Sequence, residues 1–397
     1  MVRLVMFLLP AFLSAVTIST NFEGGSLGSV QKVEENHYRL GVNGEKDQDG
    51  RNRQASWYYF AVNDPPTGEL VLDMVDLPGE YNYAPNKGAI TKATPPVISF
   101  DRKTWKHLED VEYDAAAPRL RLKIRASGKP FWVAHVPPYT NTDLAALRKE
   151  ARRHADFREE VAGKSLAGRD ILVWTIHSGT LQGKKTIWLM FRQHSWESGS
   201  SWVGEGTVRS LLANTPAAEK LRQDYIWKIF PLCDPDGVAR GGVRFNRNGF
   251  DLNRNWDVVD PVRMPEITVQ RDAVKRWIDA GHSVDFYLSL HNTETAEYLQ
   301  AAAGVESKFH ALAERLFEQL TKTSFAPSRP LFAAAPGKSE NRGRMTVIQG
   351  LYATFQFPAF LMEQRIGYDE KLGHFPNIPD RLKFGGELVG AIARAQP

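Results

Sequence analysis

The sequence predicts a two-part α/β protein, in which an antiparallel β-sandwich precedes a mixed, mostly parallel sheet flanked by helices. Residues 16–136 show strand patterns without a long helical period, which is typical of a small sandwich domain. In residues 137–397, apolar strand candidates alternate with helical segments, and this alternation indicates a sheet covered on both faces. Several of these strand candidates run into a histidine or a glutamate, which predicts a site at one edge of the sheet.

The N-terminal part contains three strand candidates. Pro118–Arg125 alternates apolar and charged residues, the pattern of a strand with one solvated face. Trp57–Val62 and Leu70–Leu77 are the other two, and residues 63–68 between them are rich in turn formers. The Pro137-Pro138 pair then marks the predicted boundary with the second part.

The second part contains both element types. Thr142-Asp143 predicts a helix N-terminus that leads into Leu144–Phe157. A second helix is indicated by apolar residues at helical spacing, which we interpret as core: Phe309, Leu312, Leu316 and Leu320. The apolar strand candidates are Ile171–Ile176, Ile187–Phe191, Ile226–Leu232 and Val284–Leu290.

Composition excludes several classes of protein. The 42% hydrophobic and 24% charged content is ordinary for a globular protein with a core. The net charge of +4 is small, and no basic run is interleaved with aromatics, so we expect no nucleic-acid partner. Cys233 is the only cysteine, which excludes an intrachain disulfide and a thiolate metal cluster.

Residues 1–15 are a candidate signal peptide. Arg3 precedes the apolar run Leu4–Leu13, and Ser14-Ala15 offers a small-residue cleavage region. The run is shorter than the roughly 20 residues that span a bilayer, so no integral membrane segment is expected after its removal. The protein would then be periplasmic or secreted. If the segment is instead the first strand of the mature fold, a cytoplasmic location is expected.

The strand ends carry candidate metal ligands. His194 follows one buried strand candidate, His291 follows another, and Glu363 ends the apolar run Phe357–Met362. Because ligands bind at the carboxyl ends of strands in open α/β sheets, these side chains can gather at one edge. A catalytic zinc needs three nitrogen or oxygen ligands and one open position, and His194, Glu197 and His291 can supply them.

The H-x-x-E pattern of His194 and Glu197 is weak by itself, because His291 and Glu294 repeat it. The first copy is favoured because it opens into the Gly/Ser-rich loop 198–201, the type of segment that carries functional sites. A swap in which His291 and Glu294 form the pair and His194 the single partner stays open. His177 and His282 stay open as weaker candidates for the third ligand.

The Asn253-Arg254 pair suits capture of a carboxylate, because a guanidinium forms planar two-point bonds with that group. The surrounding segment is also rich in arginines with acidic residues interspersed, so a solvated charged loop is the alternative interpretation.

Taken together, these residues resemble the zinc metallocarboxypeptidases related to carboxypeptidases A and B. The matching pieces occur in the order and spacing of that family: His194-x-x-Glu197, Pro235-Asp236-Gly237, Arg244, Asp251-Leu252-Asn253-Arg254-Asn255-Trp256, Leu290-His291 and Met362-Glu363. The short interval between Glu197 and His291 is similar to that of the cytosolic-carboxypeptidase subgroup and its bacterial members. The N-terminal pieces that resemble the β-sandwich domain of this subgroup are Phe22–Gly25, Trp57–Phe60 and Pro137–Tyr139.

The resemblance implies a zinc carboxypeptidase-like catalytic domain in residues 137–397 that removes single C-terminal residues from peptides or proteins. One Zn²⁺ per chain would be held by His194, Glu197 and His291. Arg244 would polarise the scissile carbonyl and Glu363 would act as general base. The terminal carboxylate of the substrate would be held by the pair Asn253 and Arg254.

Three details depart from the family pattern or leave it open. Asp234 stands where relatives often carry asparagine. Tyr352 is a candidate for the tyrosine that covers the substrate. Counting back from the predicted base places Ile348 at the specificity position, whereas the local pattern favours Arg344. A basic residue there would favour a C-terminal Glu or Asp, and a neutral preference with Arg344 turned away is the alternative.

Two other functions remain as alternatives. A zinc amidohydrolase of the same fold, similar to desuccinylases and aspartoacylases, would use Asn253 and Arg254 to hold the carboxylate of a small N-acyl amino acid. A binding module that has lost activity would need a missing ligand or base, and the sequence lacks neither.

Overall fold

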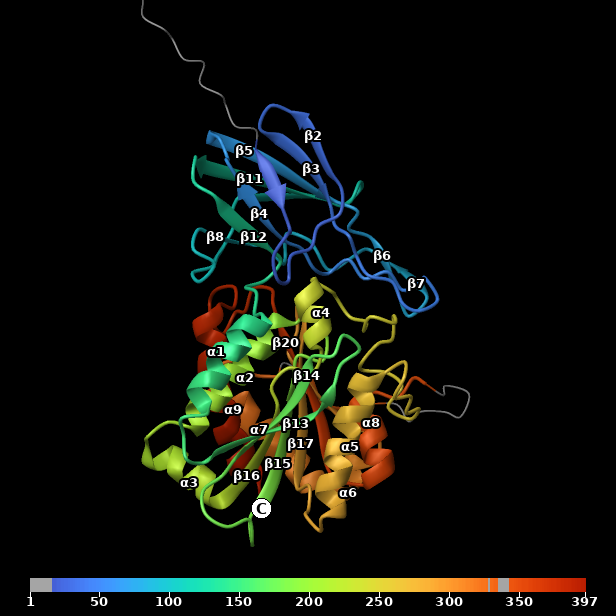
Figure 1. Cartoon of the computed structure of the whole chain (residues 1–397), viewed down its shortest axis with the longest axis vertical. Coiled ribbons are helices and arrows are strands. Elements are labelled where there is room, and N and C mark those ends of the chain that lie inside the picture. The colour runs from blue at the N-terminus through green and yellow to red at the C-terminus, as the bar shows by residue number, and fades with distance from the viewer. Residues whose placement is uncertain (1–15, 328, 335–342) are drawn as a thin grey trace, which may run out of the picture.

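A computed structural model describes residues 16–327, 329–334 and 343–397. The candidate signal peptide, residues 1–15, lies outside the described residues, so it stays a prediction. Figure 1 shows two lobes stacked along the long axis of the molecule. We call the strands from Thr17 to Ala134 the N-terminal lobe, and the elements from Asn141 to Ala395 the C-terminal lobe.

The N-terminal lobe consists of two five-stranded sheets, as the sandwich prediction requires. One sheet has the order β1 (Thr17–Ser19), β4 (Tyr59–Asn63), β12 (Phe131–Ala134), β8 (Val97–Ser99) and β9 (Lys106–His107). The other has the order β10 (Val111–Asp114), β11 (Arg119–Ser127), β5 (Thr67–Val75), β3 (His37–Gly41) and β2 (Val30–Glu34). All pairings are antiparallel except that of β3 with β5, which is parallel. A separate hairpin is formed by β6 (Gly79–Tyr81) and β7 (Ala84–Asn86).

The alternating pattern predicted for the longest strand of this lobe is confirmed. In β11, the apolar residues Leu120, Leu122 and Ile124 are buried, and the charged residues between them are partly exposed. The turn-rich segment 63–68 leads the chain from β4 in one sheet to β5 in the other. The apolar faces of the two sheets therefore enclose a single core.

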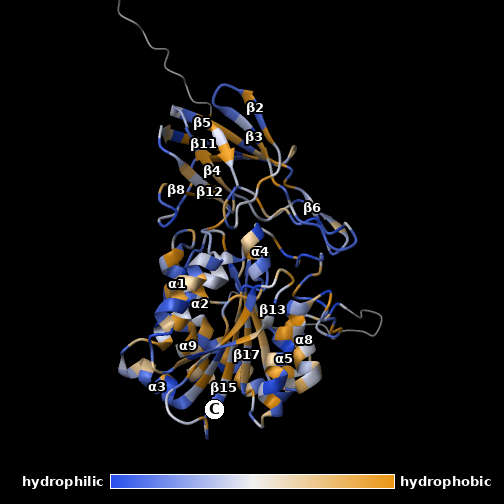
Figure 2. Cartoon of the chain, viewed as in Figure 1, coloured by the Kyte–Doolittle hydropathy of each residue, from blue (hydrophilic) through white to orange (hydrophobic). Residues whose placement is uncertain are grey.

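The C-terminal lobe is built on one mixed sheet, in agreement with the predicted fold class. Its strands in spatial order are β13 (Phe157–Lys164), β14 (Asp170–Ile176), β16 (Tyr225–Phe230), β15 (Lys185–Phe191), β17 (Phe286–Thr293), β20 (Ala359–Arg365), β18 (Tyr298–Ala302) and β19 (Arg329–Ala334). The four central strands, from β16 to β20, are parallel to one another. Figure 2 shows that hydrophobic residues are concentrated on these strands.

Helices cover both faces of this sheet (Figure 1). They are α1 (Asn141–Ala151), α2 (Ser198–Leu211), α3 (Pro216–Asp224), α4 (Pro235–Arg240), α5 (Pro265–Asp279), α6 (Val305–Lys308), α7 (His310–Thr321), α8 (Val347–Phe355) and α9 (Ile378–Ala395). Of the four residues predicted at helical spacing, Leu312, Leu316 and Leu320 are buried on α7, whereas Phe309 directly precedes this helix and packs partly buried against the same core. No helix in the described ranges has both the length and the apolarity that crossing a bilayer requires.

The first helix of this lobe ends earlier than predicted. Its N-terminus is a capping box formed by Thr140 and Asp143, which satisfies backbone N–H groups that a helix start leaves free. The helix stops at Ala151, and Phe157 begins the edge strand β13 instead of ending the helix. The Phe157 ring packs against Trp174 at a centroid distance of 5.4 Å. Tertiary packing of this aromatic ring therefore overrides the local helical pattern.

Close packing between α2 and α9 depends on glycine. A Cβ atom at Gly206 would lie 2.1 Å from the carbonyl oxygen of Leu382, and one at Gly385 would lie 2.4 Å from that of Val203. A side chain at either position would push the helices apart. Because α2 begins directly after Glu197, this contact helps to set the position of the glutamate.

The two lobes share a hydrophobic cluster. The N-terminal lobe contributes Trp57, Tyr59 and Val97, and these pack with Trp196 and Val243 of the C-terminal lobe. The loop between His194 and Glu197 is thus in contact with the N-terminal lobe through Trp196. The interface between the lobes therefore reaches the predicted metal ligands.

Candidate active site

The structure brings together the three predicted metal ligands. One side-chain donor atom from each of His194, Glu197 and His291 lies within 4.8 Å of the others, and all three residues are buried. His194 Nδ1 is 2.7 Å from Glu197 Oε1, and His291 Nδ1 is 3.0 Å from Glu197 Oε2. Two imidazole nitrogens thus face the two oxygens of one carboxylate.

This donor set fits a divalent metal. Glu197 Oε2 and His291 Nδ1 are buried and, among the described residues, make no hydrogen bond of acceptable geometry. Buried polar atoms normally have a partner, so a shared cation between them accounts for the arrangement. Two nitrogens and a carboxylate are ligands that zinc prefers.

A second layer of contacts orients both imidazoles. His194 Nε2 lies 3.1 Å from Asp251 Oδ1, and His291 Nε2 lies 2.9 Å from Ser289 Oγ. Partners at the far nitrogen fix the ring orientation of metal-binding histidines and leave the other nitrogen for the metal. In both residues, Nδ1 is therefore the nitrogen that points into the cluster.

The loop that carries His194 and Glu197 is held by a buried arginine. Arg192 directly follows β15 and adopts a positive φ of 58°, which turns the chain out of the strand. Its guanidinium donates from Nε and Nη2 to the carbonyl oxygen of Ser195, at 2.9 and 2.5 Å. The Arg192 side chain therefore fixes the backbone between His194 and Glu197.

Glu363 lies beside the cluster because of strand pairing. β17 extends beyond Leu290, so His291 lies inside this strand, and its partner in the register of β20 is Glu363. Burial raises the pKa of Glu363 well above its ordinary value, and the charge of Glu197 adds to this, whereas Arg244 opposes it. A hydrogen bond with Tyr298, the partner of Glu363 in β18, also lowers this pKa.

Arg244 and Asp251 form an ion pair next to the cluster. Arg244 Nε donates to Asp251 Oδ2 at 2.7 Å, while the other oxygen of Asp251 contacts His194. Burial opposes ionisation of Asp251, but Arg244 and His194 hold its pKa well below the ordinary value. Asp251 thus links the predicted carbonyl-polarising arginine to a predicted metal ligand.

A pocket of about 200 Å³ adjoins Arg244 and is lined by both lobes. Arg254 and Arg344 line it from the C-terminal lobe. Asn253 does not line this pocket but directly precedes Arg254 in the chain. Its Oδ1 accepts a hydrogen bond from the backbone N–H of Val347 at 2.9 Å, which leaves its Nδ2 as the donor group. The three predicted carboxylate-binding and specificity residues therefore occupy one region.

Other candidates lie elsewhere. Ile348 is fully buried in the main core, so Arg344 is the residue of this pair that reaches the pocket. Tyr352 packs on the same core with its hydroxyl close to Gly304, and it does not line the pocket that holds Arg244. Its role as a lid therefore stays a prediction. Glu294 accepts a hydrogen bond from the Thr293 hydroxyl.

The alternative ligand sets are not assembled. Among the described residues, the group of three possible metal donors does not include Glu294, His177 or His282. His282 instead stacks on Trp277 at a centroid distance of 4.0 Å.

Several residues of the site carry no local sequence signal of their own. Asp251 appeared only within the family motif, and Ser289 and Tyr298 enter through strand register. The N-terminal lobe contributes Tyr81 and Asn82 to the pocket wall, and no local pattern marks them. Only pairing between distant segments could have identified these positions.

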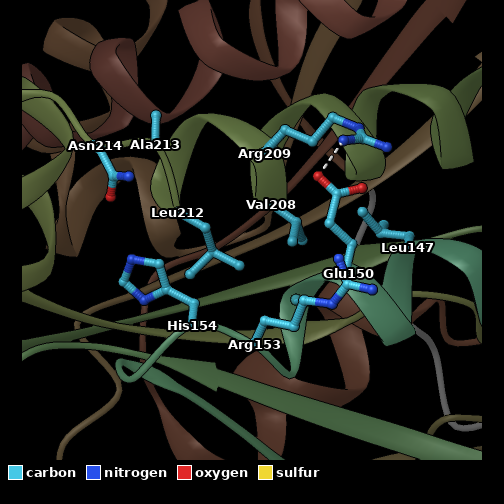
Figure 3. A pocket seen from close by; sticks show the side chains of 10 residues that line it. Leu147, Glu150, Arg153, His154, Val208, Arg209, Leu212, Ala213 and Asn214 are labelled. Atoms are coloured by element: carbon cyan, nitrogen blue, oxygen red, sulfur yellow. Dashed lines mark hydrogen bonds and ion pairs between the residues drawn. The ribbon is translucent and has the colours of Figure 1, made fainter.

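A larger cavity lies away from the predicted site residues. It measures about 490 Å³ and lies between α1 and α2 (Figure 3). Its lining includes His154, Arg153 and the ion pair of Glu150 with Arg209, and none of the nine predicted site residues. The smaller pocket, in contrast, is lined by Arg244, Arg254 and Arg344.

Comparison with known families agrees with the geometry. The zinc carboxypeptidase model matches residues 144–298, and the model of the cytosolic carboxypeptidase N-terminal domain matches residues 18–135. Residues 144–298 of the chain belong to the zinc carboxypeptidase family. The match to the N-terminal domain also confirms the predicted similarity to the cytosolic-carboxypeptidase subgroup. The comparisons do not favour the amidohydrolase alternative.

Individual proteins similar to this chain are also named carboxypeptidases. Mouse cytosolic carboxypeptidase 6 is 28% identical over 299 residues, which cover 70% of this chain and 54% of the mouse protein. The chain thus spans about half the length of that relative. A metallo-carboxypeptidase from Burkholderia cenocepacia has a TM-score of 0.82 at 20% identity and covers 96% of this chain and 99% of its own. One from Pseudomonas aeruginosa has a TM-score of 0.79, at 20% identity and 95% and 98% coverage.

Proposed function

We propose that this member of the zinc carboxypeptidase family is a metallocarboxypeptidase that hydrolyses the C-terminal peptide bond of peptides or proteins. The observation that carries the proposal is the convergence of His194, Glu197 and His291 beside Glu363. These side chains come from segments far apart in the sequence, and their meeting at one sheet edge supports a metal-assisted hydrolysis. In this proposal, residues 16–136 form an accessory domain and residues 137–397 the catalytic domain.

His194, Glu197 and His291 would hold one Zn²⁺ per chain. Bound there, zinc would supply Lewis acidity that activates a water molecule near neutral pH. Glu363 would take a proton from the attacking water and deliver it to the leaving amine. A raised pKa suits this task, since a general base works best when its pKa approaches the working pH.

Arg244 would stabilise the negative charge that develops on the scissile carbonyl oxygen. Within the described residues, its Nε is the nitrogen that bonds Asp251, so the two Nη groups remain for a ligand. A preorganised donor of this kind is typically worth roughly 3–4 kcal/mol in the transition state. Asp251 would hold the guanidinium in place as the charge forms.

Arg254 and Asn253 would bind the terminal carboxylate of the substrate, which limits cleavage to the last residue. Arg344 lines the same pocket and would pair with an acidic side chain at that residue. We therefore propose a preference for C-terminal Glu or Asp.

A comparison of matched peptides tests the proposed function. Peptides with a free C-terminus should lose one residue at a time, as followed by mass spectrometry, whereas the same peptides with an amidated C-terminus should remain intact. Amidation removes the charge that Arg254 would bind, so equal cleavage of both forms would indicate an endopeptidase. Release of an acyl group from N-acyl amino acids with no peptide cleavage would indicate the amidohydrolase alternative.

A further inference from the structure

Glu45 belongs to the N-terminal lobe, but its carboxylate is bound by the C-terminal lobe. Its Oε2 accepts hydrogen bonds from three consecutive backbone N–H groups, those of Val243, Arg244 and Phe245, at 3.0, 2.6 and 2.8 Å. Its Oε1 forms an ion pair with Arg240. The side chain is only 12% exposed. Successive backbone N–H groups that converge in this way form a binding site for an anion, and here the anion is a side chain of the other lobe.

The segment that Glu45 binds carries the predicted carbonyl-polarising arginine. Residues 243–245 belong to neither a helix nor an extended strand, so hydrogen bonding along a helix or sheet does not satisfy their N–H groups. Buried backbone donors need a partner, and Glu45 supplies one for three of them. The backbone of Arg244 is thus fixed by Glu45, and its side chain by Asp251.

A second contact from the N-terminal lobe reaches the same arginine. The Tyr81 ring lies over the Arg244 guanidinium, with 5.6 Å between the ring centroid and Cζ. Tyr81 ends β6, which is attached to the segment that carries Glu45: the Glu80 N–H donates to the carbonyl of Arg53, and residues 45 and 54 form a bridge. Two connected segments of the N-terminal lobe therefore contact Arg244: Glu45 binds its backbone, and Tyr81 packs on its guanidinium.

We propose that Glu45 is a positioning residue for Arg244. The N-terminal lobe would then contribute to catalysis by holding this arginine in place. This inference rests on the proposed function, because it concerns the arginine that would meet the developing oxyanion. A displacement of about 1 Å in such a group can lower the rate by roughly 10²-fold. Because the contact acts mainly on the transition state, the loss is expected in kcat more than in KM.

Glu23 provides a matched control. It is also a glutamate of the N-terminal lobe that accepts backbone hydrogen bonds from the C-terminal lobe, from Asn141 and Thr142 at 3.0 and 3.3 Å. Those N–H groups lie at the start of α1 and not beside Arg244. Glu23→Ala therefore weakens the contact between the lobes without touching the segment of the arginine.

The experiment compares wild type, Glu45→Ala, Glu45→Gln and Glu23→Ala for kcat, KM, bound zinc and hydrogen exchange of the 241–251 segment. We expect Glu45→Ala to lower kcat about 10²-fold with full zinc content and faster exchange in this segment. Glu45→Gln keeps an acceptor oxygen without its charge, so it should recover part of the loss. Glu23→Ala should stay within a few-fold of wild type and leave exchange of this segment unchanged.

Equal effects of Glu45→Ala and Glu23→Ala on kcat would overturn the inference, as would unchanged exchange at 241–251 in the Glu45 variants. If Glu45→Ala does not fold, the Glu45→Gln variant tests the inference. A wild-type kcat and wild-type hydrogen exchange in that variant would refute the proposed positioning of Arg244 by Glu45. Wild-type protein without any peptidase activity would refute the proposed function instead, and hydrogen exchange would still test whether Glu45 fixes the Arg244 segment.

Discussion

His291 and Glu363 are direct partners in the register of two parallel strands, β17 and β20. Adjacent strands lie about 4.8 Å apart, and paired residues point to the same face, so this register alone brings the imidazole next to the carboxylate. A shift of one residue would turn Glu363 to the opposite face. The proposed base and one proposed metal ligand are therefore placed by a single pairing.

The metal content provides the first prediction. Purified protein should contain about one zinc per chain by elemental analysis, and His291→Ala should lose most of it because only two donors would remain. His282→Ala is the control, since this histidine stacks on Trp277 outside the cluster. Full activity of a zinc-free preparation would refute the proposed site.

The second prediction concerns the general base. Glu363→Gln should keep its zinc, because residue 363 is not one of the three donors, yet kcat should fall roughly 10²–10⁴-fold. Glu294→Gln changes a nearby carboxylate whose charge contributes to the raised pKa of Glu363, and it should have a much smaller effect. A near-normal kcat for Glu363→Gln would assign the base to another residue.

The third prediction concerns substrate preference. Arg344→Ala should lower kcat/KM for peptides that end in glutamate by about 10–100-fold relative to peptides that end in leucine. A hydrogen bond to a charged group contributes roughly 1.5–3 kcal/mol, which corresponds to that ratio. The exposed Arg247, which does not line the pocket, is the control position. Unchanged selectivity in Arg344→Ala would favour the neutral preference.

The fourth prediction links stability to pH through Asp234. This residue is fully buried, and burial raises its pKa from 3.8 to about 7. Between these values the unfolded chain releases the proton and the folded chain keeps it, so stability falls as pH rises. Asp234→Asn removes this cost and should increase the free energy of unfolding at pH 8 by up to about 4 kcal/mol. At pH 4 the gain should nearly vanish.

Urea unfolding at both pH values measures this difference. Asp236→Asn is the control, because the Asp236 carboxylate is paired with Arg169 and accepts from Ser165, and its loss should destabilise the protein at either pH. Equal stabilisation by Asp234→Asn at pH 4 and pH 8 would show that the carboxyl of Asp234 is not held protonated in the folded protein.

Much of the fold was predictable because the spacing of apolar and charged residues within a segment indicates its secondary structure. Alternation of apolar and charged residues identified β11, and apolar runs identified β14, β15 and β16 with boundaries within two residues. Phe157 was assigned to a helix and belongs to the edge strand β13, since its ring packs on Trp174. The parallel pair of β3 and β5 also lies beyond what local pattern can indicate, because pairing direction depends on how the chain returns to the sheet.

By itself, the sequence determined that donor side chains for metal-assisted hydrolysis accompany the apolar strands, since residue type and local periodicity are enough to establish that, although His291 and Glu363 lie inside β17 and β20 and not at their ends. Only the tertiary structure decided that Asp251 joins Arg244 to His194, that Arg344 and not Ile348 enters the pocket, and that Glu45 binds the backbone of Arg244. The Glu45 contact depends on packing between the lobes, and the other two depend on how segments outside the strands of the C-terminal lobe are placed. The Glu45 contact joins residues about 200 positions apart, and no pattern within a single segment records it.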